Sequence, residues 1–255
     1  MAMHLKLISC EVFYREISYL VSRSPNQVDV EFLPKGLHDI GAAGMSDRVK
    51  EVLDQVDESL YDAILLGYGL CNNGLAGLQA RSIPLVLPRA HDCITLFLGD
   101  RSRYINYFND HPGVYFQTSG WIERGQAKSQ LNGMSIQSKN YIGAGLDVLI
   151  ERYGEENGRY LFEMLGNDTE HYQQITFIEM GVEPDNRFEK EAKAQSIRKG
   201  WLFEKIQGDL KLLKNLVDGN WDPNDFLIIP PHNRITASYD DNIVNSEQIE
   251  EVSSK

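Results

Sequence analysis

The first half of the chain alternates short apolar runs with stretches of helical periodicity. The apolar runs predict four strands, at residues 5–9, 28–33, 63–67 and 84–87. Apolar residues spaced three and four apart predict the intervening helices, at residues 12–21, 46–56, 75–80, 92–98 and 101–108. Ser46 and Asp47 offer a side-chain cap for the second of these helices. Strands that alternate with helices are typical of a parallel sheet covered by helices.

The second half is richer in helical patterns. We expect strands at residues 114–117, 175–178 and 226–229, and helices at residues 141–153, 156–165, 188–200 and 201–218. The polar, acidic stretch at 239–255 predicts a disordered tail. The chain is therefore expected to be an α/β protein with a mostly parallel sheet flanked by helices, as one large domain or as two Rossmann-like lobes. In the second case, residues 1–120 form an α/β lobe with the cysteines, and 121–238 form a helix-rich α/β lobe.

The charge balance and the apolar runs exclude several classes of protein. The 255 residues carry a net charge of −12, from 25 Lys and Arg against 37 Asp and Glu. Nucleic-acid binding needs a basic face that replaces phosphate counterions, so no nucleic-acid partner is expected, whereas a small anionic ligand remains compatible. No apolar run approaches the roughly 20 residues that span a bilayer, and the apolar N-terminal stretch is too short for a secretory signal. We therefore expect a cytoplasmic protein without a membrane partner, whose cysteines are reduced thiols.

All three cysteines of the chain fall at the carboxyl ends of predicted strands. Cys10 follows the first strand and Cys71 lies in the turn after the third. Cys93 follows the fourth strand, with His91 two residues before it. The carboxyl ends of parallel strands share one edge of a sheet, where α/β proteins bind their ligands. We therefore expect the three thiols and the His91 imidazole to meet at one site.

Such a group of side chains is suited to a metal ion. Three thiolates and an imidazole form a common tetrahedral zinc set, and softer ions accept the same donors. An open variant is equally consistent, in which three protein ligands hold the ion and a substrate thiol takes the fourth place. A zinc-bound thiolate stays nucleophilic at neutral pH, so such a centre can alkylate sulfur. An iron–sulfur centre would use the same residues, and the alternative without a metal is that each cysteine is a buried apolar residue.

Three neighbouring side chains are candidates for holding a substrate beside the thiols. Arg89 can bind a carboxylate or a phosphate, Asn72 can offer its amide, and Trp121 can stack on an apolar group. Each also has a structural explanation: a surface salt bridge for Arg89, a tight turn for Asn72, and packing for Trp121. Asp92 either orients His91 or caps the helix that begins after it, and capping is the commoner role.

Three segments carry a resemblance to a known family. GYGLCNNG at residues 67–74, PRAHDCITLFLG at 88–99 and HPGVYFQTSGWIE at 111–123 resemble the domain of unknown function 1638, and the resemblance extends over roughly residues 5–235. That family has no established activity, and the resemblance implies a context of anaerobic one-carbon metabolism with corrinoid-dependent methyl transfer. The His-x-Cys pair of His91 and Cys93 is similar to the thiol-activating zinc sites of methyl-cobamide-dependent methyltransferases. The D-x-H-x-x-G signature of a bound corrinoid is absent from the sequence.

These observations leave two functional hypotheses. The first is a metal-thiolate enzyme, with zinc as its cofactor, that transfers a methyl or alkyl group in corrinoid-linked metabolism. Its partners would be a small anionic molecule and a corrinoid protein or methyltransferase. The second is a non-catalytic accessory protein that delivers a metal or cofactor, or binds a methyltransferase. An open coordination position beside a pocket of small-molecule size favours the enzyme, whereas a closed four-ligand site without a pocket favours the accessory protein.

Overall fold

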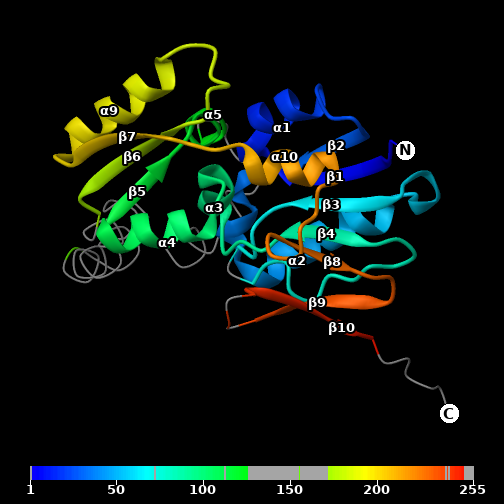
Figure 1. The fold of residues 1–255 in the computed structure, drawn as a ribbon. Coiled ribbons are helices and arrows are strands. Elements are labelled where there is room, and N and C mark those ends of the chain that lie inside the picture. The colour runs from blue at the N-terminus through cyan, green and yellow to red at the C-terminus, as the bar shows by residue number, and fades with distance from the viewer. Residues whose placement is uncertain are drawn as a thin grey trace.

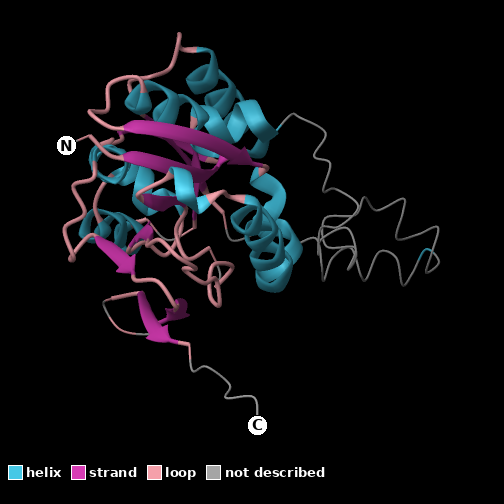
Figure 2. Cartoon of the chain, turned by 90° about the vertical axis from the view of Figure 1, so that its right-hand side faces the viewer, coloured by secondary structure: helices cyan, strands magenta, loops and turns pink. Residues whose placement is uncertain are grey.

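The fold is built from two sheets and a C-terminal hairpin. The computed structural model describes residues 2–71, 73–111, 113–125, 155, 172–238, 240 and 242–249. A five-stranded sheet has the order β2-β1-β3-β4-β8, a three-stranded sheet has the order β5-β6-β7, and β9 pairs with β10 (Figure 1). Helices lie on both sides of the strands in the view of Figure 2. This is the mixed α/β architecture with a mostly parallel sheet that the sequence predicts.

The five-stranded sheet is the larger of the two. Its strands are β1 (His4–Cys10), β2 (Gln27–Leu33), β3 (Ala63–Gly67), β4 (Leu85–Pro88) and β8 (Phe226–Ile229). The first four run parallel, and β8 joins the edge of β4 antiparallel. Every residue of β3 and β4 is buried. Continuous apolar runs of this kind are expected of parallel strands that are covered by helices on both faces.

Each face of the larger sheet has its own core. Leu7 belongs to a core with residues of α1 (Tyr14–Val21) and α10 (Lys211–Asp218). Its neighbour Ile8 belongs to a second core with residues of α2 (Gly41–Gln55). Successive side chains of a strand point to opposite faces, so β1 supplies both cores.

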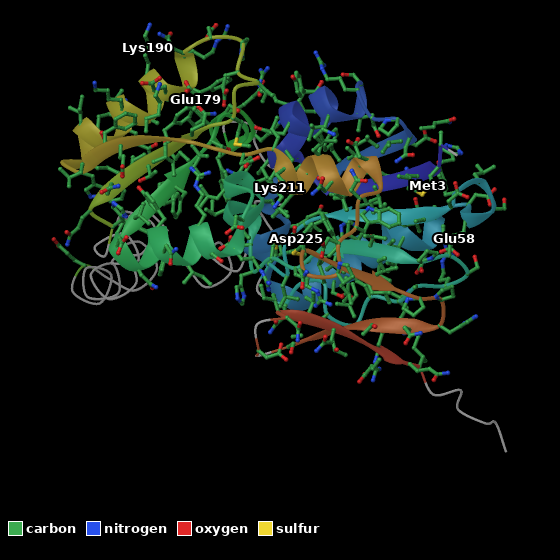
Figure 3. All side chains as sticks on the ribbon, in the orientation of Figure 1. Met3, Glu58, Glu179, Lys190, Lys211 and Asp225 are labelled. Carbon is green, nitrogen blue, oxygen red and sulfur yellow. The ribbon has the colours of Figure 1, made fainter. Side chains whose placement is uncertain are left out.

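An ion pair lies between α10 and the start of β8. The ammonium of Lys211, the first residue of α10, lies 4.0 Å from the carboxylate of Asp225, which directly precedes β8 (Figure 3).

The second sheet follows two short helices in the chain. These are α3 (Cys93–Leu98) and α4 (Arg101–Asp110). The parallel strands of the second sheet are β5 (Val114–Gln117), β6 (Gln174–Glu179) and β7 (Leu202–Gln207), accompanied by α5 (Ser119–Gly125) and α9 (Arg187–Lys199). Short 3-10 turns lie at η1 (Glu11–Phe13), η2 (Lys35–Ile40) and η3 (Glu58–Leu60). No described helix is long and apolar enough to cross a membrane.

A close contact joins the two sheets at α5. A Cβ added to Gly120 would lie 1.8 Å from the carbonyl oxygen of Val12, so only glycine fits there. Arg15 of α1 donates to the Glu123 carboxylate at 2.8 and 2.9 Å, which adds a bidentate ion pair to the same contact. As a result, the first turn after β1 and the first turn after β5 are held against each other. The carboxyl ends of β1 and β5 therefore lie close to each other.

All seven strands expected from the sequence, including the strand at residues 114–117, are present near their predicted bounds. The sheets do not divide at residue 120, however. β5 precedes that position and belongs to the second sheet, whereas β8 follows it and belongs to the first. The chain returns to the first sheet at β8, which pairs antiparallel with β4. This pairing joins residues far apart in the sequence, so no local pattern predicts it. The helices expected at 141–153 and 156–165 lie outside the described residues.

Three expected helices and the expected tail need correction. The helix expected at 46–56 begins at Gly41, and Ser46 lies inside it with its hydroxyl donating to the Ala76 carbonyl at 3.4 Å. Residues 75–80 form turns instead of a helix, because their backbone groups bond to the segment that contains β9 (Asn233–Ala237). The expected helix at 201–218 is β7 followed by α10, because six successive residues pair with β6. Within the expected disordered tail, Val244–Gln248 forms β10 and pairs with β9.

Candidate functional site: a thiol-lined pocket

Loops that leave neighbouring strands meet at the carboxyl edge of the larger sheet. The loop after β3 is hydrogen-bonded to the loop after β4: the backbone N–H of Leu70 donates to Ala90 at 2.7 Å, and that of Cys71 donates to His91 at 2.9 Å. A Cβ added to Gly69 would lie 2.7 Å from the backbone of Asp92, so glycine permits this approach. Cys71 itself has a φ of 47°, a left-handed conformation that L-residues rarely adopt.

These loops place all three cysteines around one cavity. Cys10 is the last residue of β1, Cys71 lies in the loop after β3, and Cys93 is the first residue of α3. The cavity has a volume of about 390 Å³, and all three residues line it. Most of the remaining wall is apolar or aromatic, including Val12, Phe13, Leu37, Met45, Ile94 and Phe116. The structure thus brings together three residues that are far apart in the sequence.

The thiols are held in their protonated form. Burial raises the pKa of Cys10 and of Cys71 to about 12, and it raises the pKa of Cys93 well above the ordinary range. The neighbouring sulfurs add to the shift in Cys71 and Cys93, because a second negative charge close by is unfavourable. The Trp121 side chain opposes the rise in the pKa of Cys93. Below about pH 10, therefore, these sulfurs are neutral unless a cation replaces their protons.

His91 does not join the thiols. Its side chain is exposed and lines a second cavity of about 370 Å³, together with Arg101 and Asp240. Among the residues that the structure describes, no group of three or more His, Cys, Asp or Glu side chains is arranged to hold a metal ion. The three sulfurs therefore share a cavity without standing at ligand distances from a common point.

Asp92 has the capping role that the sequence favours. One carboxylate oxygen accepts from the backbone N–H of Ile94 at 2.9 Å and of Thr95 at 3.2 Å, at the start of α3. The other oxygen accepts from the Tyr104 hydroxyl at 3.0 Å. Asp92 and Tyr104 both line the thiol pocket, so the cap also fixes part of its wall. This network holds Cys93 in place at the first turn of α3.

Of the three residues expected to bind a substrate, one lines the thiol pocket, one does not, and one lies outside the described residues. Arg89 does not line the thiol pocket, because its guanidinium donates to the carbonyls of Pro223, Asn242 and Val244 at 2.9, 3.0 and 2.5 Å. It therefore holds the β9–β10 hairpin on the edge of the sheet. Asn72 lies outside the described residues. Trp121 lines the pocket, and the ammonium of Lys35 lies 4.5 Å from the centre of its ring.

Tyr68 and Lys35 are among the polar residues of this wall that the sequence does not single out. Tyr68 directly follows β3, between Gly67 and Gly69, so the position after a strand was a usable signal. The pattern of metal ligands and nucleophiles does not point to it, because a phenol is seldom either. Lys35 lies just after β2, and only the fold shows that it faces Trp121.

The fold and the pocket together define an α/β protein with a thiol-lined cavity at the carboxyl edge of a parallel sheet. The chain belongs to the family described as Protein of unknown function (DUF1638), whose model matches residues 32–217. This confirms the resemblance drawn from the sequence segments around Cys71 and Cys93, whereas Cys10 precedes the matched residues. No curated protein and no solved structure matches the chain.

Proposed function

We propose that this protein binds one thiophilic metal ion, zinc in the first instance, through Cys10, Cys71 and Cys93, and presents it to a small molecule in the adjacent cavity. The observation that supports this most strongly is the convergence of all three cysteines of the chain on one pocket. They reach it from three separate strand ends. Cysteines that served only as apolar packing residues would not be expected to line the same cavity.

The state of the thiols supports a metal over free nucleophiles. Their raised pKa values keep them protonated at neutral pH, and a neutral thiol is a weak nucleophile. A bound cation replaces the protons and stabilises three thiolates without exposing them to water. Sulfurs that share a tetrahedral ion lie about 4 Å apart, since each bond is about 2.3 Å. Rotation of the cysteine side chains would bring the three sulfurs to this distance from one another.

The pocket favours an enzyme over a metal carrier. With the His91 ring outside the cavity, three protein ligands leave the fourth position of the ion free for a substrate. Catalytic zinc sites keep such an open position, whereas structural sites are closed by four ligands. The cavity of about 390 Å³ is within the range of small-molecule sites.

The reaction class that follows is alkyl transfer to sulfur. A substrate thiol would lose its proton when it binds the ion, and its sulfur would then form a bond to the methyl or alkyl carbon of a donor. The bond between that carbon and its leaving group breaks, and the electron pair stays with the leaving group. A methylated corrinoid protein is the donor expected as partner, with cobalt as the leaving group.

Elemental analysis of protein purified anaerobically tests the proposal. We expect about one zinc per chain in the wild type, and a loss of most of it in Cys71→Ser and in Cys93→Ser. His91→Ala is the matched control, because this histidine lies next to the same loops but faces another cavity. It should keep its metal. A wild-type protein without metal after reconstitution, or metal loss in His91→Ala alone, would contradict the proposal.

A further inference from the structure

Tyr68 has a buried hydroxyl group without a hydrogen-bond partner. Its side chain is 2% exposed and its ring belongs to the core beneath α2. It also lines the thiol pocket. No group in the described part of the chain accepts from its hydroxyl or donates to it. Buried hydroxyls are nearly always paired, because an unpaired one loses its bonds to water without compensation.

Other tyrosines show that the fold ordinarily supplies such partners. The hydroxyl of Tyr61 donates to Asp29 at 3.0 Å, and that of Tyr104 donates to Asp92 at 3.0 Å. The hydroxyl of Tyr107 donates to Glu204 at 2.6 Å. All three of these residues are more exposed than Tyr68, yet their hydroxyls are partnered. Unlike these three hydroxyls, that of Tyr68 is left without a partner in the wall of the pocket.

The surroundings of Tyr68 indicate what its hydroxyl can do. The sulfurs of Cys10 and Cys71 are close enough to influence its ionisation, and burial holds the pKa of Tyr68 well above the ordinary range. The phenol therefore keeps its proton and offers a donor. It makes no hydrogen bond to either sulfur, so that donor is directed to neither thiol. The missing acceptor is best supplied by a molecule that occupies the cavity.

We propose that the Tyr68 hydroxyl donates a hydrogen bond to an oxygen atom of the substrate that binds in the thiol pocket. This inference rests on the proposed role of the cavity as a substrate site. The aromatic and apolar wall, with Phe13, Phe116 and Trp121, fits an apolar body. The substrate class is therefore a small thiol with an aromatic or branched apolar body and a carbonyl or carboxylate oxygen. Tyr68 positions that oxygen beside the sulfurs.

Two probes of equal shape separate the hydrogen bond from apolar packing. Acetophenone has a carbonyl oxygen where α-methylstyrene has a methylene group, and the two molecules otherwise match. Calorimetry with metal-reconstituted protein gives the affinity for acetophenone divided by the affinity for α-methylstyrene. This ratio should be about five- to tenfold higher in the wild type than in Tyr68→Phe, the effect of one neutral hydrogen bond, because the different hydration of the two probes cancels between the two proteins. Tyr107→Phe is the control, because its hydroxyl bonds to Glu204 outside the pocket, and it should keep the wild-type ratio.

Thermal melting supplies an independent readout. Tyr68→Phe loses no hydrogen bond and should melt at or above the wild-type temperature, whereas Tyr107→Phe should melt lower. The inference is overturned if the wild type binds neither probe, if Tyr68→Phe keeps the wild-type affinity ratio, or if Tyr68→Phe melts clearly lower. Metal content of the same preparations tests the proposed function separately, since Tyr68→Phe retains all three cysteines.

Discussion

Glu16 predicts an unusual dependence of stability on pH. This residue of α1 is 0% exposed, and neither carboxylate oxygen has a hydrogen-bond partner elsewhere in the described residues. Burial raises its pKa from 4.5 to about 8, and the nearby charges of Glu183 and Glu123 add to the shift. The native protein therefore keeps Glu16 protonated at pH values at which the unfolded chain has already ionised it.

The sign and size of the effect follow from this difference. Between about pH 4.5 and pH 8 the native state binds more protons than the unfolded state, so the free energy of unfolding falls as pH rises. One pKa unit corresponds to about 1.4 kcal/mol, so the full loss is about 5 kcal/mol. That is a large part of the stability of a typical domain. Glu16→Gln keeps the size of the side chain and cannot ionise, so it should abolish this contribution.

Urea denaturation of metal-free protein at pH 5, 6, 7 and 8 measures the effect. The quantity of interest is the stability of Glu16→Gln minus that of the wild type, because other titrating groups cancel in it. This difference should be small near pH 5 and grow to about 4 kcal/mol at pH 8. Glu51→Gln, at an exposed ion pair with Arg48, should show no such growth. A difference that stays constant from pH 5 to pH 8 would refute a neutral buried Glu16.

Two further predictions concern the surroundings of the site. Arg89→Ala should lower the free energy of unfolding by about 2 kcal/mol, measured by urea titration, because three carbonyls that it bonds are released. Limited proteolysis should then cut first near the β9–β10 hairpin, and an unchanged cleavage pattern would argue against the clamp. Metal-free native protein should react slowly with iodoacetamide at pH 7 and faster as pH rises, because Cys10 and Cys71 have pKa values of about 12. Fast labelling at pH 7, followed by mass spectrometry, would contradict buried neutral thiols.

Strongly apolar segments could be predicted from the sequence because their burial is local information. The strand at 63–67 has its predicted bounds, since AILLG is apolar on both faces. β7 could not be recognised in the same way. None of its residues is buried, and their strand conformation depends on pairing with β6 rather than on an apolar pattern. The same holds for β9 and β10, a polar hairpin that is attached by Arg89.

The site was predictable to the extent that the strand-end rule applies. Cys10, Cys71 and Cys93 line one pocket, as their positions after strands suggested. That rule does not set the direction of a side chain within a loop. The backbone carbonyl of His91 accepts a hydrogen bond from the Cys71 loop, whereas its ring lines a different cavity. The position of Tyr68 after a strand indicates that it lies at this edge, but its burial and its unpaired hydroxyl depend on the fold.

The central claim is that the three thiols bind one ion, and X-ray absorption at the zinc edge tests it most directly. Protein purified anaerobically, or reconstituted with one equivalent of zinc under reducing conditions, provides the sample. We predict three sulfur neighbours at about 2.3 Å and one lighter atom at the open position. Cys71→Ser should lose one sulfur from that shell or lose the ion. A shell of nitrogen and oxygen alone would contradict the account.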